Sequence, residues 1–409
     1  MQFRDYNPEK DKAAVHRIWL ETGWIEKGHE DWMDTHLSSG PCLVADVEGE
    51  AECLVHRTLG NVRHLKNDLR LCVITAVTTS RIARKQGLAG ELTAKAIAMG
   101  AKEGALVSAL GMFEQGYYNR HGFGTGVYEN YLTFHPALLD VYVKPRVPIR
   151  IKATDWAHVH QARLNRKRGH GSCSIDSPNF TRADMECTKT GFGLGYRDAD
   201  GNIGHHMWCS VEGSVERGPY RIHWLVFRNR DEFLELMAVL KGMGDQVFKA
   251  KMREVPLLQI QDLLRQPFMM RTITDGGKFH MTQDATAWWQ MRINNLPECL
   301  AKTNLECGEV RFNLRLTDPI EQFLREESQW RGCAGDYIVT LGDECSAKPG
   351  EDAKLLTLEA SVNSFTRMWL GVRSPSGLSY TDNLSGPPKL LEQLDRALQM
   401  PVPKPDWDF

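Results

Sequence analysis

The residues best suited to chemistry lie where a strand-like run meets a helix-like run. The stretch ITAVTTSRIARKQGLAGELTAKAI places Arg84, Gly87 and Ala89 in the spacing R-x-x-G-x-A. β-Branched residues precede this loop and an alanine-rich segment follows it, which predicts a strand, a loop and a helix. Main-chain N–H groups at a helix start converge where the helix dipole is positive, so the loop suits a pyrophosphate. Arg84 and Lys85 would add charge, and Gly87 would let the backbone approach the ligand.

A second candidate is the glycine-rich tract QGYYNRHGFGTG, which contains Tyr117 and Tyr118. A phenol has an ordinary pKa of about 10, so it is protonated at neutral pH and can act as a proton donor. The alternatives are core packing for Tyr117 and a loop-anchoring hydroxyl for Tyr118. For the basic loop the corresponding alternative is an ordinary solvated turn.

Two further segments carry aromatic residues beside charge. The stretch ETGWIEKGHEDWMDTH combines Trp24 and Trp32 with acidic residues, which would suit a cationic amine. The alternative is a solvated acidic face with one or two tryptophans packed inward. The chain ends PVPKPDWDF, and two aromatic residues in the last three after a proline-stiffened approach favour a docked tail over a frayed one.

Composition excludes several classes of function. The 409 residues include 50 Lys plus Arg and 52 Asp plus Glu, giving a formal charge of -2, so we expect no nucleic-acid partner. No run approaches the roughly 20 apolar residues of a membrane span and the N-terminus is polar, so we expect a cytoplasmic protein without a membrane partner. Ten scattered cysteines form no CxxC pair and the histidines no HExxH motif, so we expect no metal.

The elements that must position these residues follow from periodicity and turn signals, and they predict a mixed α and β protein. Two prolines in VKPRVPIRI indicate a boundary near residue 146, and a third part is expected to begin at about residue 286. Helices are predicted at 13–24, 88–104, 230–248 and 387–398. Strands are predicted at 43–47, 51–55, 69–79, 105–110, 127–134, 220–227, 311–316, 336–342 and 355–360.

The basic loop resembles the acetyl-CoA loop of the GCN5-related N-acetyltransferases, whose pattern is Q/R-x-x-G-x-G/A. In that family the strand before the loop lies beside the pantetheine and hydrogen-bonds to it through main-chain groups. The resemblance implies acetyl-CoA as the acetyl donor, without a metal. It implies that the cofactor is bound by Val77, Thr78, Thr79, Arg84, Lys85, Gln86, Gly87, Leu88 and Ala89.

A narrower resemblance, to the enhanced intracellular survival (Eis) branch, rests on TAVTTSRIARKQGLA and FEQGYYNRHGFG. It implies an α+β chain of three domains. These are an acetyltransferase domain at 1–145, a second domain of similar fold without cofactor at 146–285, and a sterol-carrier-like domain at 286–409. Resemblance to this branch also suggests a homo-oligomer.

The Eis resemblance also implies roles for individual residues. Tyr118 takes the place of the general acid in the motif G-x-Y-x-R-x-G-[YF]-G, which is matched by Gly116, Tyr118, Arg120, Gly122, Phe123 and Gly124. The α-carboxylate of Phe409 takes the place of the base, although its ordinary pKa of about 3.5 makes it a weak one unless burial raises it. It would then orient an ammonium group, or remove its proton through water, as readily as it abstracts the proton directly.

The acceptor pocket would be lined by Trp24, Trp32 and Ala76. This chain departs from the Eis pattern at Ala76, where a bulky aromatic residue is replaced, and at Arg81, Lys85 and Gln86 in the loop.

Together these features predict an acetyl-CoA-dependent N-acetyltransferase acting on a primary amine of a small or lysine-containing acceptor. The alternative is a non-catalytic acyl-CoA or lipid-binding protein, or a scaffold.

Overall fold

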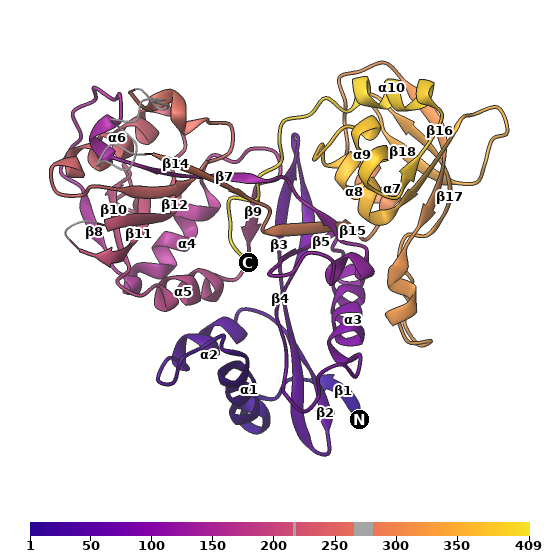
Figure 1. Ribbon diagram of the computed structural model, residues 1–409, viewed down its shortest axis with the longest axis horizontal. Coiled ribbons are helices and arrows are strands. Elements are labelled where there is room, and N and C mark those ends of the chain that lie inside the picture. The colour runs from indigo at the N-terminus through magenta and orange to yellow at the C-terminus, as the bar shows by residue number, and fades with distance from the viewer. Residues whose placement is uncertain (216–217, 266–280) are drawn as a thin grey trace. The chain divides into compact units, whose positions relative to one another are not determined.

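The structure is a computed structural model that describes residues 1–215, 218–265 and 281–409. The chain divides into two compact units (Figure 1). The first consists of residues 1–127, 170–177 and 287–409, and the second of residues 128–169 and 178–286. The N-terminal and C-terminal parts of the chain therefore share one unit. The expected division into three domains stays a prediction.

An eight-stranded sheet lies at the centre of the first unit, with the order β1-β2-β3-β4-β5-β15-β6 and with β9 paired to β3. Its strands are β1 (Gln2–Asp5), β2 (Cys42–Val47), β3 (Glu50–His64), β4 (Asn67–Thr79), β5 (Val107–Gly111), β6 (Gly124–Thr125), β9 (Cys173–Ile175) and β15 (Trp289–Ile293). Its helices are α1 (Pro8–Thr22), α2 (Asp31–Leu37) and α3 (Leu88–Lys102). The predicted first helix, the β2–β3 hairpin and the succession of β4, α3 and β5 are confirmed.

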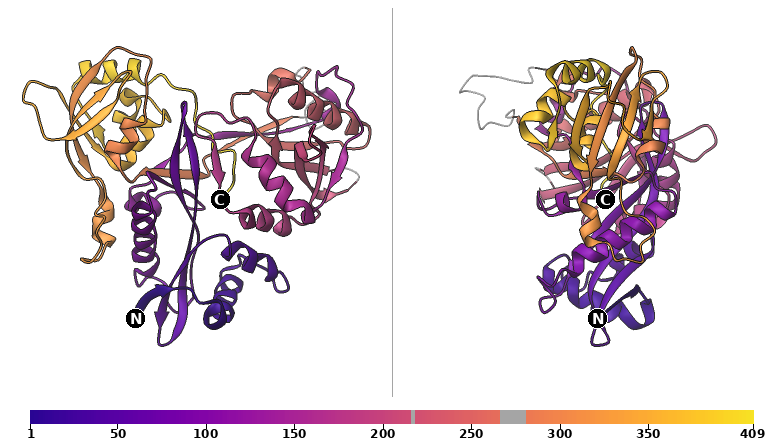
Figure 2. Two further views of the ribbon diagram at one scale, coloured as in Figure 1. Left: turned by 180° about the vertical axis from the view of Figure 1, so that it is seen from behind. Right: turned by 90° about the vertical axis from the view of Figure 1, so that its right-hand side faces the viewer.

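Apolar side chains cover both faces of this sheet because successive residues of a strand point to opposite sides. Cys53 and Val55 of β3 join the core beneath α3, whereas Leu54 joins the core beneath α1 and α2. Figures 1 and 2 show α1 and α2 on one face of the sheet and α3 on the other. Both faces of β4 are therefore covered.

The C-terminal part of the first unit has a five-stranded sheet of its own, with the order β18-β17-β16-β19-β20. The strands are β16 (Val310–Thr317), β17 (Gly335–Leu341), β18 (Ser346–Pro349), β19 (Thr357–Ser361) and β20 (Leu384–Ser385). The helices are α7 (Leu296–Ala301), α8 (Val362–Trp369), α9 (Pro375–Thr381) and α10 (Pro388–Ala397). The predicted strands at β16, β17 and β19 and the closing helix α10 are confirmed, while the likeness to sterol-carrier domains stays a prediction.

The second unit is built on a seven-stranded sheet with the order β14-β7-β13-β12-β11-β10-β8. Its strands are β7 (Glu129–Phe134), β8 (Ile149–Ile151), β10 (Phe192–Arg197), β11 (Ile203–Ser214), β12 (Gly218–Val226), β13 (Ala250–Arg253) and β14 (Thr282–Thr286). Helices α4 (Trp156–Leu164), α5 (Pro178–Cys187) and α6 (Arg230–Gly242) complete it. The expected α+β class is confirmed. Every helix in the described ranges is too short or too polar to cross a membrane.

Candidate functional site

The main chain of β4 has an open edge at its C-terminal end. β4 and β5 run parallel and pair from Leu71 with Val107 to Ile74 with Leu110. β5 ends one residue later, whereas β4 continues to Thr79, and no described strand pairs with this edge of β4 beyond Ile74. The unpaired N–H and C=O groups of such an edge can hydrogen-bond an extended ligand.

A β-bulge separates the two halves of β4. The pairing of β3 with β4 shifts register between Leu54 and His56, where Ala76 and Val77 together oppose Val55. Ala76 has a φ of 52°, which is uncommon for a residue that is not glycine. A bulge bends and twists its strand, and β4 pairs with β5 only in the half that precedes the bulge.

The predicted pyrophosphate loop lies directly after this open edge. Gly87 precedes α3 with a φ of 84°, and no side chain caps the first turn of the helix. Arg84 and Lys85 are exposed, and within the described residues neither side chain has a hydrogen bond or an ion pair. The start of α3 therefore presents main-chain N–H groups beside two uncommitted cations, which is the chemistry that an anion requires.

The remaining predicted cofactor residues occupy the strand end and the helix start. Thr78 accepts a hydrogen bond from Nε1 of Trp19 at 3.1 Å, and Thr79 Oγ1 lies 3.3 Å from the Cys53 thiol. Val77 is half-buried and Leu88 is buried in the core beneath α3. Gln86 donates to the carbonyl of Ile82, which holds the loop closed on itself, and Ala89 lies in the first turn of α3.

The three predicted acceptor residues gather around a tryptophan that the sequence analysis did not select. The ring of Trp19 lies 5.5 Å from the ring of Trp24 and 5.8 Å from that of Trp32. Ala76 belongs to the same apolar cluster as Trp19 and Trp32. Trp24 is 42% exposed and presents an aromatic face to solvent at this end of the sheet.

Two titratable side chains near Trp19, those of Asp34 and His36, carry little free charge. Asp34 pairs with Lys12 at 2.6 Å and with His16 at 2.8 Å, so its charge is committed within the protein. Burial lowers the pKa of His36, whose ring is 6.2 Å from Trp19, to about 4, so that His36 is neutral at pH 7.

Tyr118 begins the short helix η1 (Tyr118–His121), which follows β5. Its side chain is 3% exposed and packs at 4.9 Å, edge to face, against the ring of Tyr117. Burial, followed by the influence of Tyr117 and Cys53, raises the pKa of Tyr118 above its ordinary value. The phenol is therefore protonated at neutral pH. Its hydroxyl makes no hydrogen bond to another described residue.

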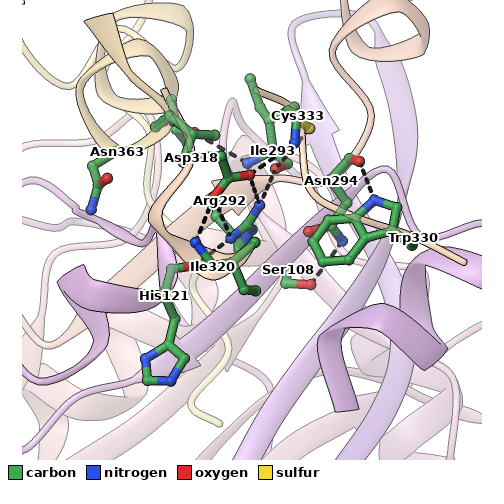
Figure 3. Close-up of polar contacts among 12 residues, drawn as sticks. Ser108, His121, Arg292, Ile293, Asn294, Asp318, Ile320, Trp330, Cys333 and Asn363 are labelled. Carbon is green, nitrogen blue, oxygen red and sulfur yellow. Dashed lines mark hydrogen bonds and ion pairs between the residues drawn. The ribbon is translucent and has the colours of Figure 1, made fainter. Parts of the chain in front are cut away.

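A buried ion pair holds the turn that carries Tyr118 (Figure 3). Arg292 of β15 and Asp318, which precedes η7 (Pro319–Phe323), pair at 2.7 Å with both side chains 0% exposed. Arg292 also donates to the carbonyl oxygen of His121. Asp318 accepts from the main-chain N–H groups of Ile320 at 3.2 Å and Cys333 at 2.9 Å. This network ties η1 to the C-terminal part of the first unit.

Other side chains hold the same turn from two further directions. Asn363 of α8 donates to the carbonyl oxygens of Asn119 and Phe123, both at 2.8 Å. His121 stacks on Phe323 with ring centroids 4.3 Å apart, and its Nε2 lies 3.1 Å from the carbonyl oxygen of Gly90 in α3. The backbone at Tyr118 is therefore fixed by contacts from β15, α3 and α8.

The C-terminal tail is docked at the end of β5. Trp407 is 1% exposed, and the ring of Phe409 lies 5.4 Å from that of Trp288. A side chain at Gly111 would overlap the main-chain oxygen of Phe409. This oxygen of Phe409 thus lies where β5 ends and the β4 edge opens. The docked tail predicted from the sequence is confirmed.

Other candidate chemistry receives no support from the geometry. Cys72 is buried beneath α3, where desolvation raises its pKa to about 12, so it remains a packing thiol. Across residues 1–215, 218–265 and 281–409, no group of three or more His, Cys, Asp or Glu side chains is arranged to hold a metal ion. A cavity of about 560 Å³ lies between α3 and the segment 323–330, and its lining includes Glu91 in the first turn of α3. The sequence patterns gave no indication of it.

Comparison with solved structures identifies proteins that share the fold of this chain. No protein-family model and no curated protein matches the chain. A conserved protein of unknown function from Enterococcus faecalis, described as a probable N-acyltransferase, has a TM-score of 0.79 at 16% identity, covering 100% of this chain and 99% of its own. A GCN5-related N-acetyltransferase from Anabaena variabilis has a TM-score of 0.76 at 14% sequence identity. Eis1 from Mycobacterium abscessus has a TM-score of 0.77 at 14% sequence identity, and each comparison covers 100% of both chains.

These similarities extend over the entire length of the chain, including the C-terminal part that delivers Phe409. They confirm the resemblance predicted from the loop and from the glycine-rich tract. The chain has the fold of the GCN5-related N-acetyltransferases, in the form that Eis1 also has.

Proposed function

We propose that this protein is an acetyl-CoA-dependent N-acetyltransferase that acts on primary amines. The observation that carries the proposal is the convergence of three features at one end of the β4–β5 pairing. These are the open edge of β4, the uncapped start of α3, and the main-chain oxygen of Phe409, to which we assign the role of a carboxylate oxygen. The names of structurally similar proteins, an N-acetyltransferase and a probable N-acyltransferase, support the same class of activity.

The residues at this place fit a long thioester ligand that carries phosphates. The edge of β4 at residues 75–79 offers main-chain groups to the amides of a pantetheine arm. The start of α3, with Gly87 at a φ of 84°, would bind the pyrophosphate, and Arg84 and Lys85 would neutralise its charge. When bound, acetyl-CoA supplies the acetyl group as a thioester.

Side-chain and main-chain groups of the protein can then remove and donate the protons that direct transfer of the acetyl group requires. The amine nitrogen forms a bond to the acetyl carbon while the bond from that carbon to sulfur breaks. The carboxylate of Phe409 orients the incoming ammonium group and takes its proton, directly or through water. The hydroxyl of Tyr118 protonates the departing thiolate, and a main-chain N–H of β4 polarises the thioester carbonyl.

The acceptor side suits an amine that carries apolar or cationic neighbours. The exposed face of Trp24 and the partly buried Trp32 can pack against methylene groups or against a second cation. Ala76 is 1% exposed and packs in the apolar cluster around Trp19, so it supports the tryptophans and does not itself face the acceptor. We propose a small polyamine-like, aminoglycoside-like or lysine-containing acceptor.

The test is release of free CoA thiol from acetyl-CoA in the presence of a panel of primary amines. The wild-type protein should release thiol only with an amine present. Replacing Tyr118→Phe should lower kcat by about 10²- to 10⁴-fold, because it removes one general acid, and should leave acetyl-CoA affinity unchanged. Tyr117→Phe is the matched control, since Tyr117 is the adjacent phenol, and it should retain kcat.

Two outcomes would contradict the proposal. An unchanged kcat in Tyr118→Phe would remove the general-acid role. Binding of acetyl-CoA without turnover on any amine would favour a non-catalytic acyl-CoA-binding protein.

A further inference from the structure

The middle of the chain contributes a short segment to the first unit. Residues 170–177 belong to the first unit, although residues on both sides of them belong to the second. Within this segment β9 pairs antiparallel with β3, from Gly60 opposite Ile175 to Val62 opposite Cys173. The pairing extends at both ends, because Arg63 N–H donates to Ser172 and Asp176 N–H donates to Leu59. One edge of β9 is thus used by the central sheet.

The C-terminal tail uses the other edge of this segment. The N–H of Cys173 donates to the carbonyl of Pro405 at 2.7 Å, and the N–H of Lys404 donates to the carbonyl of His170 at 3.0 Å. Alternate residues of a strand direct their main-chain groups to opposite edges, so Cys173 can bind the tail while its neighbours bind β3. The tail is therefore held by main-chain hydrogen bonds four residues before its end.

Gly171 is the point of closest approach between the segment and the tail. It has a φ of 83°, and a Cβ there would lie 2.5 Å from the nitrogen of Lys404 and 2.8 Å from Cα of Pro403. Its own N–H donates to Arg63 at 2.7 Å. Because the overlapping atoms are backbone atoms, a side chain at Gly171 would push the tail away from β9.

The segment itself has little freedom to follow such a displacement. Nε2 of His170 lies 3.0 Å from the carbonyl oxygen of Leu370, and its Nδ1 accepts from the N–H of Leu65 at 3.1 Å. The rings of His170 and His64 are 5.1 Å apart. His170 thus anchors the segment both to the β3–β4 turn and to the region after α8.

We propose that Gly171 and β9 position the C-terminal carboxylate for acetyl transfer. This inference rests on the proposed function, in which the carboxylate of Phe409 handles the acceptor amine. Three residues separate Pro405 from Phe409, and the four steps between them span at most about 14 Å when extended. The register fixed at Lys404 and Pro405 therefore sets where the carboxylate lies relative to Gly111. Gly171 acts as a positioning residue through the tail.

The experiment measures kcat for acetyl transfer and the Kd of acetyl-CoA in Gly171→Ala. We expect kcat to fall about 100-fold, as is typical of a displacement of about 1 Å in a reacting group, and the Kd to change less than about twofold. Gly201→Ala is the matched control. Gly201 has nearly the same φ, 82°, but no atom lies within 4 Å of an added Cβ, so kcat should be retained.

The decisive comparison introduces Gly171→Ala into protein that lacks Phe409. If Gly171 acts through the carboxylate, Gly171→Ala should lower kcat no further in that background. Lys404→Pro supplies a second variant if Gly171→Ala fails to fold, since it removes the N–H that donates to His170 and leaves β9 unchanged. Lys404→Pro should also lower kcat in the full chain, and it should lower kcat no further in protein that lacks Phe409.

The outcomes separate this inference from the proposed function. Full kcat after deletion of Phe409 would refute the role of the carboxylate, and the positioning inference with it. Loss of kcat on deletion of Phe409, with full kcat in Gly171→Ala and in Lys404→Pro, would refute only the positioning inference. The same fall for Gly171→Ala with and without Phe409 would also refute it.

Discussion

The buried pair of Arg292 and Asp318 should dominate the local stability of the first unit. Asp318→Ala leaves the guanidinium of Arg292 with no counter-charge at a position that is 0% exposed. It also leaves the N–H groups of Ile320 and Cys333 without their carboxylate acceptor. Removing one partner of a buried pair typically costs about 3–5 kcal/mol, and we expect a loss of that size in the free energy of unfolding.

The assay is urea unfolding followed by tryptophan fluorescence, because the Trp330 ring lies 5.1 Å from the Arg292 guanidinium. The matched control is Glu306→Gln. Glu306 pairs with Lys66 at a similar distance, 2.9 Å, but the side chains are 87% and 82% exposed. Exposed pairs contribute little, so the midpoint of this variant should equal that of the wild type.

The double variant Arg292→Met with Asp318→Leu isolates the cost of the unpaired charge. Replacing a buried pair by apolar residues of similar size avoids the unpaired charge, so the double variant should be more stable than Asp318→Ala. Equal midpoints for Asp318→Ala and Glu306→Gln would refute the reasoning. Such a result would mean that the charge of Arg292 is stabilised equally well without Asp318. The pair would then not hold the turn that carries Tyr118.

Two predictions concern pH. His121 is 0% exposed and burial lowers its pKa to about 4, so this group binds more protons in the unfolded chain between pH 6.5 and 4. The stability that His121 contributes should be full above pH 6.5, and up to about 3 kcal/mol of it should be lost as pH decreases to 4. Urea midpoints across this range should fall less steeply for His121→Gln than for the wild type, and equal slopes would contradict the assignment. In the second unit, the hydrogen bond from Arg146 lowers the pKa of Glu235 to about 2, so its stabilising contribution should be present above pH 4.5 and lost toward pH 2. Glu235→Gln should reduce that acid dependence, and an unchanged acid midpoint would count against it.

Local patterns in the sequence predicted the elements that carry the loop. β-Branched residues before Ser80 and alanine-rich residues after Gly87 are local signals, and the strand, loop and helix lie where they were expected. Gly87 has the positive φ that favours glycine at the start of α3. The aromatic residues near the chain end also indicated correctly that the tail docks, because Trp407 is buried.

The parts that the sequence did not predict depend on pairing between distant residues. The contact of Arg292 with His121 spans 171 positions, and its only local signal is a charged residue inside the apolar run AWWQMRI. The β9 segment is too short for a periodic pattern and is fixed by β3 and the tail. The bulge at Ala76 follows from the register of β3 against β4, which no single strand encodes.

The central claim is that the start of α3 and the edge of β4 bind acetyl-CoA, and calorimetric titration tests it most directly. Gly87→Glu places bulk and negative charge where the pyrophosphate is expected. Gly104→Glu is the control, because Gly104 follows the other end of α3 with a similar φ of 89° and open space around it. We predict micromolar affinity for the wild type and for Gly104→Glu, and a loss of at least about 100-fold in Gly87→Glu. Absence of binding to the wild type, or equal affinity in Gly87→Glu, would contradict the account.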